Sequence, residues 1–224
     1  MLRTKPIYML IGLLLGISLW SYAAAAEPSK LILALGDGSY LPGEVTGAEV
    51  THELGDRDLM GFAVVILSNV PYDQLPGAVR EHLTTFLDQG GSLLITGGPN
   101  AYGSGGYQPM AALIPFEIRT SNDWRAVPFL EIIPLEPGNP ILQGVTFGTV
   151  GWFNDLNPKP GVTEIAQYAG GKTGYPSPLI AEQQVGQGTV LGVAFDLGQQ
   201  VQGGWADGSR FVQNVLTYLV TRAP

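Results

Sequence analysis

A strand–helix–strand unit between residues 62 and 96 constrains the fold of this chain more than any other feature. Phe62 to Leu67 is a continuous, partly β-branched apolar run, which is typical of a strand covered on both faces. Apolar residues then recur at helical spacing and predict a helix from about Asp73 to Gln89, ended by Gly90-Gly91. Ser92 to Thr96 is a second apolar strand. Two strands joined by one helix predict a parallel pair with a right-handed crossover.

Further elements are expected on both sides of this unit. Leu31 to Leu35 reads as a buried strand, and Val45 to Leu54 as a weaker, peripheral one. After the unit, the pattern predicts four strands and a final helix, over Phe129 to Leu135, Val162 to Tyr168, Leu179 to Gln184, Val190 to Asp196 and Ser209 to Arg222.

These elements predict an α/β fold, a flavodoxin-like three-layer sandwich with a mostly parallel sheet. The stretch between Leu35 and Phe62 has little room for a full helix, so we expect a short first crossover, made by a loop or hairpin. The last two strands flank Gly186-Gln187-Gly188, which predicts a hairpin and an antiparallel C-terminal extension.

Residues 1–26 have the pattern of a secretory signal peptide. Arg3 and Lys5 precede an apolar stretch from Ile7 to Trp20, and Ala24 to Ala26 offer a small-residue cleavage site before Glu27. We expect one mature domain over residues 27–224, in the periplasm or secreted from a bacterium. The alternative is an uncleaved anchor, which would be the chain's one attachment to a membrane.

Charge and cysteine content narrow the possible functions. Removal of Arg3 and Lys5 with the signal takes the formal net charge from −8 to −10, which argues against nucleic acid as a partner. The sequence contains no Cys, which excludes thiol nucleophiles and thiolate metal sites, and an exported protein without disulfides fits a bacterial envelope. We expect no cofactor.

The run "VVILSNVPYDQLPGAVREHLTTFLDQGGSLLITGGPNAYGSGGYQPMAALIP" resembles glutamine amidotransferase-like envelope domains of the class I glutamine amidotransferase-like superfamily. Weaker similarity continues from about Pro128 to Leu219. Active members carry a Cys at a strand-to-helix elbow and a His after a later strand. Here Gly98 or Pro99 falls at the elbow, and Phe195-Asp196-Leu197-Gly198 ends the later strand without a His. The resemblance therefore implies the fold without the amidotransferase chemistry.

Three further features could take part in catalysis or binding, and each also has a simpler structural interpretation. Ser104 lacks a G-x-S-x-G elbow and a partner His, so we interpret it as a loop residue. The stretch from Gly98 to Gly106 is glycine-rich enough to hold a phosphate, or simply to make a tight loop. Asp37, Asp196 and Glu53 are candidates for a metal site or for turn formation, and we predict no metal.

Loop aromatics suggest either a ligand platform or filling around glycine-rich loops. These residues are Trp124, Trp152, Trp205, Tyr102, Tyr107 and Tyr175.

Ligands of open parallel sheets bind at the carboxyl ends of the strands. We therefore predict a shared cleft lined by Asp37, Asn100, Tyr102 and Asp196, with Trp205 as a possible wall and no catalytic residue. The function that this favours is a non-catalytic binding or interaction module of the envelope, with an envelope protein or a carbohydrate as its partner. The alternative is a carboxylate- or metal-dependent hydrolase acting on carbohydrate or another envelope substrate.

Overall fold

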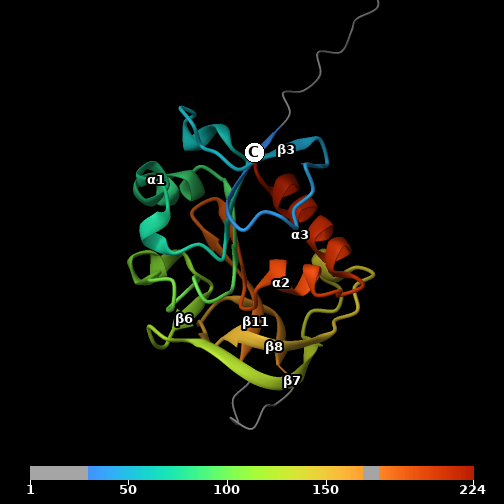
Figure 1. The fold of residues 1–224 in the computed structure, drawn as a ribbon. Coiled ribbons are helices and arrows are strands. Elements are labelled where there is room, and N and C mark those ends of the chain that lie inside the picture. Colours follow the sequence, from blue (N-terminus) through green and yellow to red (C-terminus); the bar gives the residue numbers. More distant parts are fainter. Residues whose placement is uncertain (1–29, 169–176) are drawn as a thin grey trace, which may run out of the picture.

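The computed structural model describes residues 30–168 and 177–224 (Figure 1). The predicted signal peptide and Tyr175 lie outside the described residues. The first half of the chain contains, in order, β1 (Leu31–Gly36), β2 (Glu44–Val45), β3 (Ala48–Thr51), the 3-10 turn η1 (Leu59–Gly61), β4 (Val64–Ser68), η2 (Tyr72–Gln74), α1 (Gly77–Asp88), β5 (Ser92–Thr96), η3 (Gln108–Leu113) and β6 (Phe116–Ile118).

The second half is richer in strands. It contains β7 (Trp124–Pro134), η4 (Pro140–Leu142), β8 (Thr149–Asn154), β9 (Leu156–Pro158), β10 (Thr163–Tyr168), β11 (Pro178–Val185), β12 (Gly188–Val193), α2 (Leu197–Gln202) and α3 (Gly208–Arg222). None of the helices in residues 30–168 and 177–224 has the length and apolar composition of a membrane-spanning segment.

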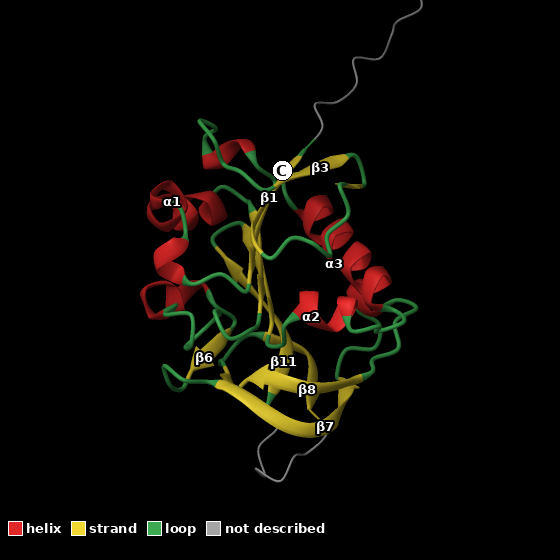
Figure 2. Ribbon diagram, viewed as in Figure 1, coloured by secondary structure: helices red, strands yellow, loops and turns green. Residues whose placement is uncertain are grey.

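Ten strands form one sheet in the order β2-β3-β1-β4-β5-β12-β11-β10-β7-β8. The pairs β3–β1, β1–β4, β4–β5 and β5–β12 are parallel. Every residue of β4 and β5 is buried, as expected for strands covered on both faces. Figure 2 shows α1 on one face of this parallel part and α3 on the other. The predicted three-layer α/β sandwich is confirmed.

The helix of the strand–helix–strand unit begins later than predicted. Pro76 precedes α1 and forces Leu75 into an extended conformation, so Tyr72–Gln74 is a separate 3-10 turn. The buried face of α1 consists of Val79, Leu83, Phe86 and Leu87.

A β-hairpin replaces the helix of the first crossover, as the short spacing allowed. The strands β2 and β3 turn through Thr46-Gly47, both at positive φ, and β3 then pairs in parallel with β1. The C-terminal helix α3 supplies the missing cover, and the Lys30 ammonium donates to the carbonyls of Val220 and Ala223 at its end.

The antiparallel extension is larger than predicted. The β11–β12 hairpin turns through Gly186-Gln187 as expected, and β10, β7 and β8 continue the sheet beyond it. The sequence patterns did not predict β8, α2 or the small β6–β9 pair. They lack a periodic apolar pattern, because β8 lies at an edge and α2 has only six residues.

Candidate functional site

The carboxyl ends of β1, β4 and β5 meet at one rim of the sheet, where a polar cluster lies. The Ser68 hydroxyl ends β4 and accepts a hydrogen bond from the Thr96 hydroxyl at 3.2 Å. It also lies 3.0 Å from the Tyr40 hydroxyl. Ser68 and Thr96 are 1% and 0% exposed, and burial raises the pKa of Tyr40 well above its usual range. This part of the rim is therefore a neutral, packed chain of hydroxyl groups.

Two of the predicted site residues, Asp37 and Asp196, converge at the N-terminus of α2. Asp196 caps the helix, accepting a hydrogen bond from the Gln199 N–H at 2.9 Å. Asp37 accepts from the Ser39 N–H and hydroxyl, and its Oδ2 lies 2.8 Å from the position that a Cβ on Gly198 would occupy. Burial raises the pKa of the Asp196 carboxyl, the nearby Asp37 carboxylate raises it further, and the Gln199 hydrogen bond opposes both.

Asn69, which the sequence reasoning missed, joins the loops of this rim. Its amide nitrogen donates to Asp196 at 3.1 Å, and its oxygen accepts from the Asn100 N–H at 2.9 Å. Asn69 has φ 47°, and Gly98 beside it has φ 141°. A Cβ at Gly98 would collide with the Asn69 side chain, so glycine is required there. The one available signal was the position of Asn69, directly after a buried strand.

Tyr102 does not line this rim, and its predicted place in the cleft is wrong. The side chain is fully buried, and its hydroxyl donates to the carbonyls of Ile95 at 3.2 Å and Val193 at 3.0 Å. Its ring packs against Tyr107 and Phe116. An apolar ring with two local acceptors for its hydroxyl is more stable inside the core than at an open rim. Tyr102 and Tyr107 thus fill space beside the glycine-rich loop.

The side chain of Asn100 is exposed, and the contact that Asn100 makes with the rim comes from its backbone N–H. Trp205 lies beyond the C-terminal end of α2. The structure thus brings together Asp37, Asp196 and the backbone of Asn100, and it buries Tyr102 in the core. The Trp205 ring packs against Phe147, Phe195 and Phe211.

The elbow that follows β5 is held by two buried polar side chains, Asn154 and Asp123. The Gly98 N–H donates to Asn154 at 2.9 Å, and the Asn154 amide donates to the Gly98 carbonyl and to Asp123. Asp123 also accepts from the Gly103 N–H, the Ser104 N–H and the Ser104 hydroxyl. The Ser104 hydroxyl is therefore structural, in agreement with its interpretation as a loop residue.

The hydrogen bonds of this loop favour the tight-loop alternative over the phosphate cradle. Hydrogen bonds within the protein use the backbone N–H groups of seven of its residues, namely Gly98, Asn100, Ala101, Gly103, Ser104, Gly105 and Gly106. A phosphate would have to displace these bonds to be held.

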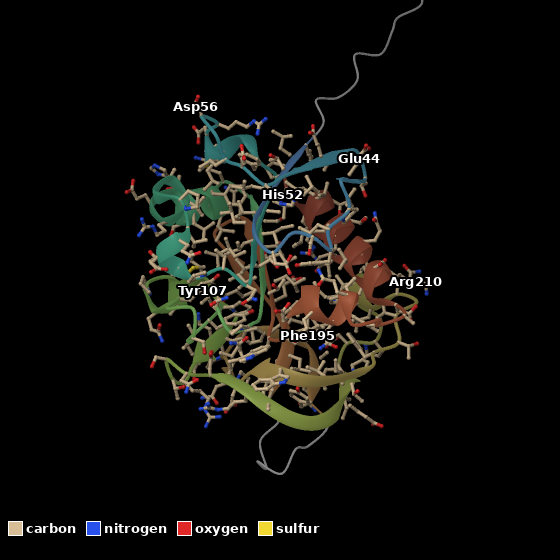
Figure 3. The ribbon with its side chains drawn as sticks, in the orientation of Figure 1. Glu44, His52, Asp56, Tyr107, Phe195 and Arg210 are labelled. Carbon is tan, nitrogen blue, oxygen red and sulfur yellow. The ribbon has the colours of Figure 1, made fainter. Side chains whose placement is uncertain are left out.

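The two histidines lie on the surface. His82 is exposed on α1, and His52 is exposed after β3, where it lies close to Gly38. Figure 3 shows His52 in the upper half of the molecule, away from Phe195. Within residues 30–168 and 177–224, no three His, Asp or Glu side chains are grouped to hold a metal ion.

A groove of about 410 Å³ lies between β8 and α2, and its walls are aromatic and amide side chains. Trp152 is 46% exposed and stacks on Trp124, with ring centroids 5.8 Å apart. Trp205 stacks on Phe147 at 5.4 Å and donates its indole N–H to the Thr146 carbonyl at 2.8 Å. The remaining lining residues are Gly148, Thr149, Gly151, Gln199, Gln200, Gly203 and Gly204.

Searches of the sequence against protein-family models and against curated proteins gave no match. Solved structures do match. A cytoplasmic protein from Salmonella typhimurium LT2 has a TM-score of 0.69 at 15% identity, covering 87% of this chain and 100% of that one. A ThuA-like protein from Bacteroides uniformis has a TM-score of 0.56 at 11% identity, covering 90% and 95%. This chain therefore shares its fold with these two proteins, one of which is described as ThuA-like.

The same fold forms part of larger enzymes. A β-galactosidase from Bacillus circulans matches with a TM-score of 0.57 at 14% identity, covering 86% of this chain but 31% of the enzyme. At these identities the matches establish the fold alone.

Proposed function

We propose that this chain is a non-catalytic binding module of the bacterial envelope, which holds its ligand in the groove between β8 and α2. The observation that carries the proposal is the chemistry of that groove. None of its described lining residues has an ionisable side chain, and two tryptophans and two glutamines stand in its walls. A catalytic site gathers titratable groups around a pocket, whereas a binding site presents aromatic and amide groups.

The rim of the parallel strands also supports a non-catalytic function, because its polar side chains already have structural roles. Asp196 and Asp37 are engaged as helix cap and turn former, and Asn69 occupies the second oxygen of Asp196. The elbow carries Gly98 and Pro99 in place of a nucleophile. Since part of a β-galactosidase shares the fold, the proposal is also consistent with a module that accompanies carbohydrate chemistry without performing it.

Retention on envelope material tests the proposal. The purified chain is mixed with washed cell envelopes of the native host and sedimented. We expect the chain to co-sediment, Trp152→Ala to remain in the supernatant, and Asp196→Asn to behave like the original. Ile133→Ala is the matched control, because Ile133 is 40% exposed on the neighbouring strand β7 but outside the groove lining. If Asp196→Asn lost retention and Trp152→Ala kept it, the binding site would be at the rim and not in the groove.

A hydrolase is the second candidate, and the convergence of Asp37 and Asp196 favours it. The raised pKa of Asp196 suits a general acid, and Asp37 supplies the second carboxyl group that glycoside hydrolysis uses. Release of soluble reducing ends from the envelopes, abolished by Asp196→Asn, would establish this function and contradict the first.

Export is part of the proposal and has its own test. Mass spectrometry of the protein from its native host should give a mature chain that begins at Glu27. A chain that retains Met1 in a membrane fraction would instead indicate an uncleaved anchor.

A further inference from the structure

We infer that the groove between β8 and α2 binds a neutral saccharide chain, with a sugar ring stacked on Trp152 and its hydroxyl groups bonded by Gln199 and Gln200. This inference rests on the proposed function, because it names the ligand class of the same groove.

The position of Trp152 supports a stacking role. Only Ile133, Leu135 and Trp152 are large apolar side chains left exposed among the described residues, and Trp152 is the one of these three in the groove lining. Trp124 covers one face of its indole at an interplanar angle of 20°. Stacking fixes the plane of the exposed ring before a ligand arrives, which lowers the entropy cost of binding. A flat apolar face in water is complementary to the C–H face of a pyranose ring.

Trp205, a second aromatic residue of the groove lining, is held by one hydrogen bond and by ring packing. Its indole N–H is bonded to the Thr146 carbonyl, and its ring is packed by Phe147 and Phe211. Gly151, Gly203 and Gly204 extend no side chain into the space between, so a ligand can approach the backbone closely.

The absence of charge in the groove lining selects against ionic ligands. A phosphate, carboxylate or ammonium group would lose its hydration there without meeting a described side chain of opposite charge. Hydroxyl groups both donate and accept hydrogen bonds, and the amides of glutamine offer both partners. Within residues 30–168 and 177–224 the side-chain amides of Gln199 and Gln200 form no hydrogen bond, so they are free for a ligand.

The extent of the hollow suits a chain of sugars. A second hollow of about 450 Å³ shares Gly148 and Thr149 with the groove, and its lining includes one charged side chain, that of Glu131. Each lies within the range of about 300–1,000 Å³ that is usual for small-molecule sites.

A peptide that pairs with the edge strand β8 is the competing ligand. The edge is a poor template for it. The register of β8 with β7 is broken between Ala126 and Leu130, and the Asn154 N–H already donates to the Ala194 carbonyl at 2.7 Å.

Native affinity electrophoresis in gels that contain one polysaccharide each tests the inference. The neutral probes are laminarin, hydroxyethyl cellulose and galactomannan, and the acidic probes are alginate and polygalacturonate. We expect retardation by at least one neutral probe and by neither acidic one, unchanged between about 0.05 and 0.5 M NaCl.

Variants of the groove residues test which side chains bind the polysaccharide. Trp152→Ala should weaken the affinity about tenfold or more, and Gln200→Ala roughly threefold. Trp152→Phe should retain part of the affinity, because it keeps a flat ring, and Ile133→Ala should change nothing. Equal melting temperatures of the variants exclude unfolding as the cause.

Retardation by acidic probes alone, or by no neutral probe, would overturn the saccharide assignment. If the envelope retention described above still depended on Trp152 in that case, the binding module would stand and its ligand class would be wrong. Loss of the Trp152 dependence in both assays would remove the proposed function itself.

Discussion

The rim of the parallel strands and the groove beside β8 both involve α2, since the Gln199 N–H donates to Asp196 and Gln199 also lines the groove. The two regions use their polar groups in opposite ways. At the rim, Asp196, Asn69 and Asn154 donate to or accept from protein groups that are distant in sequence. In the groove, the amides of Gln199 and Gln200 have no partner within the described residues. Polar groups engaged in this way stabilise the fold, whereas those left free in a shaped, uncharged hollow are available to a ligand.

This contrast predicts that rim substitutions change stability and that groove substitutions change binding. The largest effect is expected at Asp123, which is 1% exposed and accepts hydrogen bonds from Gly103, Ser104 and Asn154. Asp123→Ala should lower the free energy of unfolding by about 3 kcal/mol, because it leaves buried donors unpaired. Urea unfolding measures this. Asp155→Ala, which removes a surface ion pair with Arg119, should cost less than about 1 kcal/mol.

A smaller loss is expected at Asn69, which tests whether the rim loops depend on one side chain. Asn69→Ala removes two hydrogen bonds and places a Cβ without side-chain compensation at φ 47°, for a loss of about 1–2 kcal/mol. Asn69→Gly relieves the backbone strain but not the lost bonds. Equal stability of the glycine variant and the original would show that the side-chain bonds contribute nothing.

The pH dependence of stability should report the burial of Asp196. Its pKa is raised in the folded state, so its contribution to stability is fully present below the unfolded pKa and is lost as pH rises through the folded pKa. Relative to Asp196→Asn, the original chain should therefore become less stable over that interval. Thermal unfolding at a series of pH values measures the difference. A pH-independent difference would mean that Asp196 is not desolvated and would weaken the contrast between rim and groove.

The smallest effect is expected at Asn100. Its side chain is exposed and only its backbone N–H is bonded, so Asn100→Ala should change the free energy of unfolding by less than about 0.5 kcal/mol. Its retention on envelopes should equal that of the original. If Asn100→Ala weakened retention without changing the melting temperature, the ligand site would lie at the rim, as predicted from the sequence. The contrast between a structural rim and a binding groove would then be wrong.

Local patterns were sufficient to predict the elements that the core requires. The apolar runs of β4 and β5 and the helical spacing of α1 predicted the parallel unit, and Gly186-Gln187 predicted the hairpin. The start of α1 was wrong, because Pro76 separates a 3-10 turn from the helix proper. The rule for the carboxyl ends of parallel strands also predicted that Asp37 and Asp196 meet.

What the sequence determined by itself is the α/β class, the parallel core and the absence of thiol chemistry, because these depend on short-range periodicity and on which residue types are present. Only the tertiary structure decided the roles of the polar and aromatic residues. Asn69 and Asp196 are 127 positions apart, and Asn154 and Gly98 are 56 apart. Whether a tyrosine such as Tyr102 is buried, or a tryptophan such as Trp152 is left exposed, depends on which strands pack around it. That packing is fixed by contacts between distant segments, which no local pattern encodes.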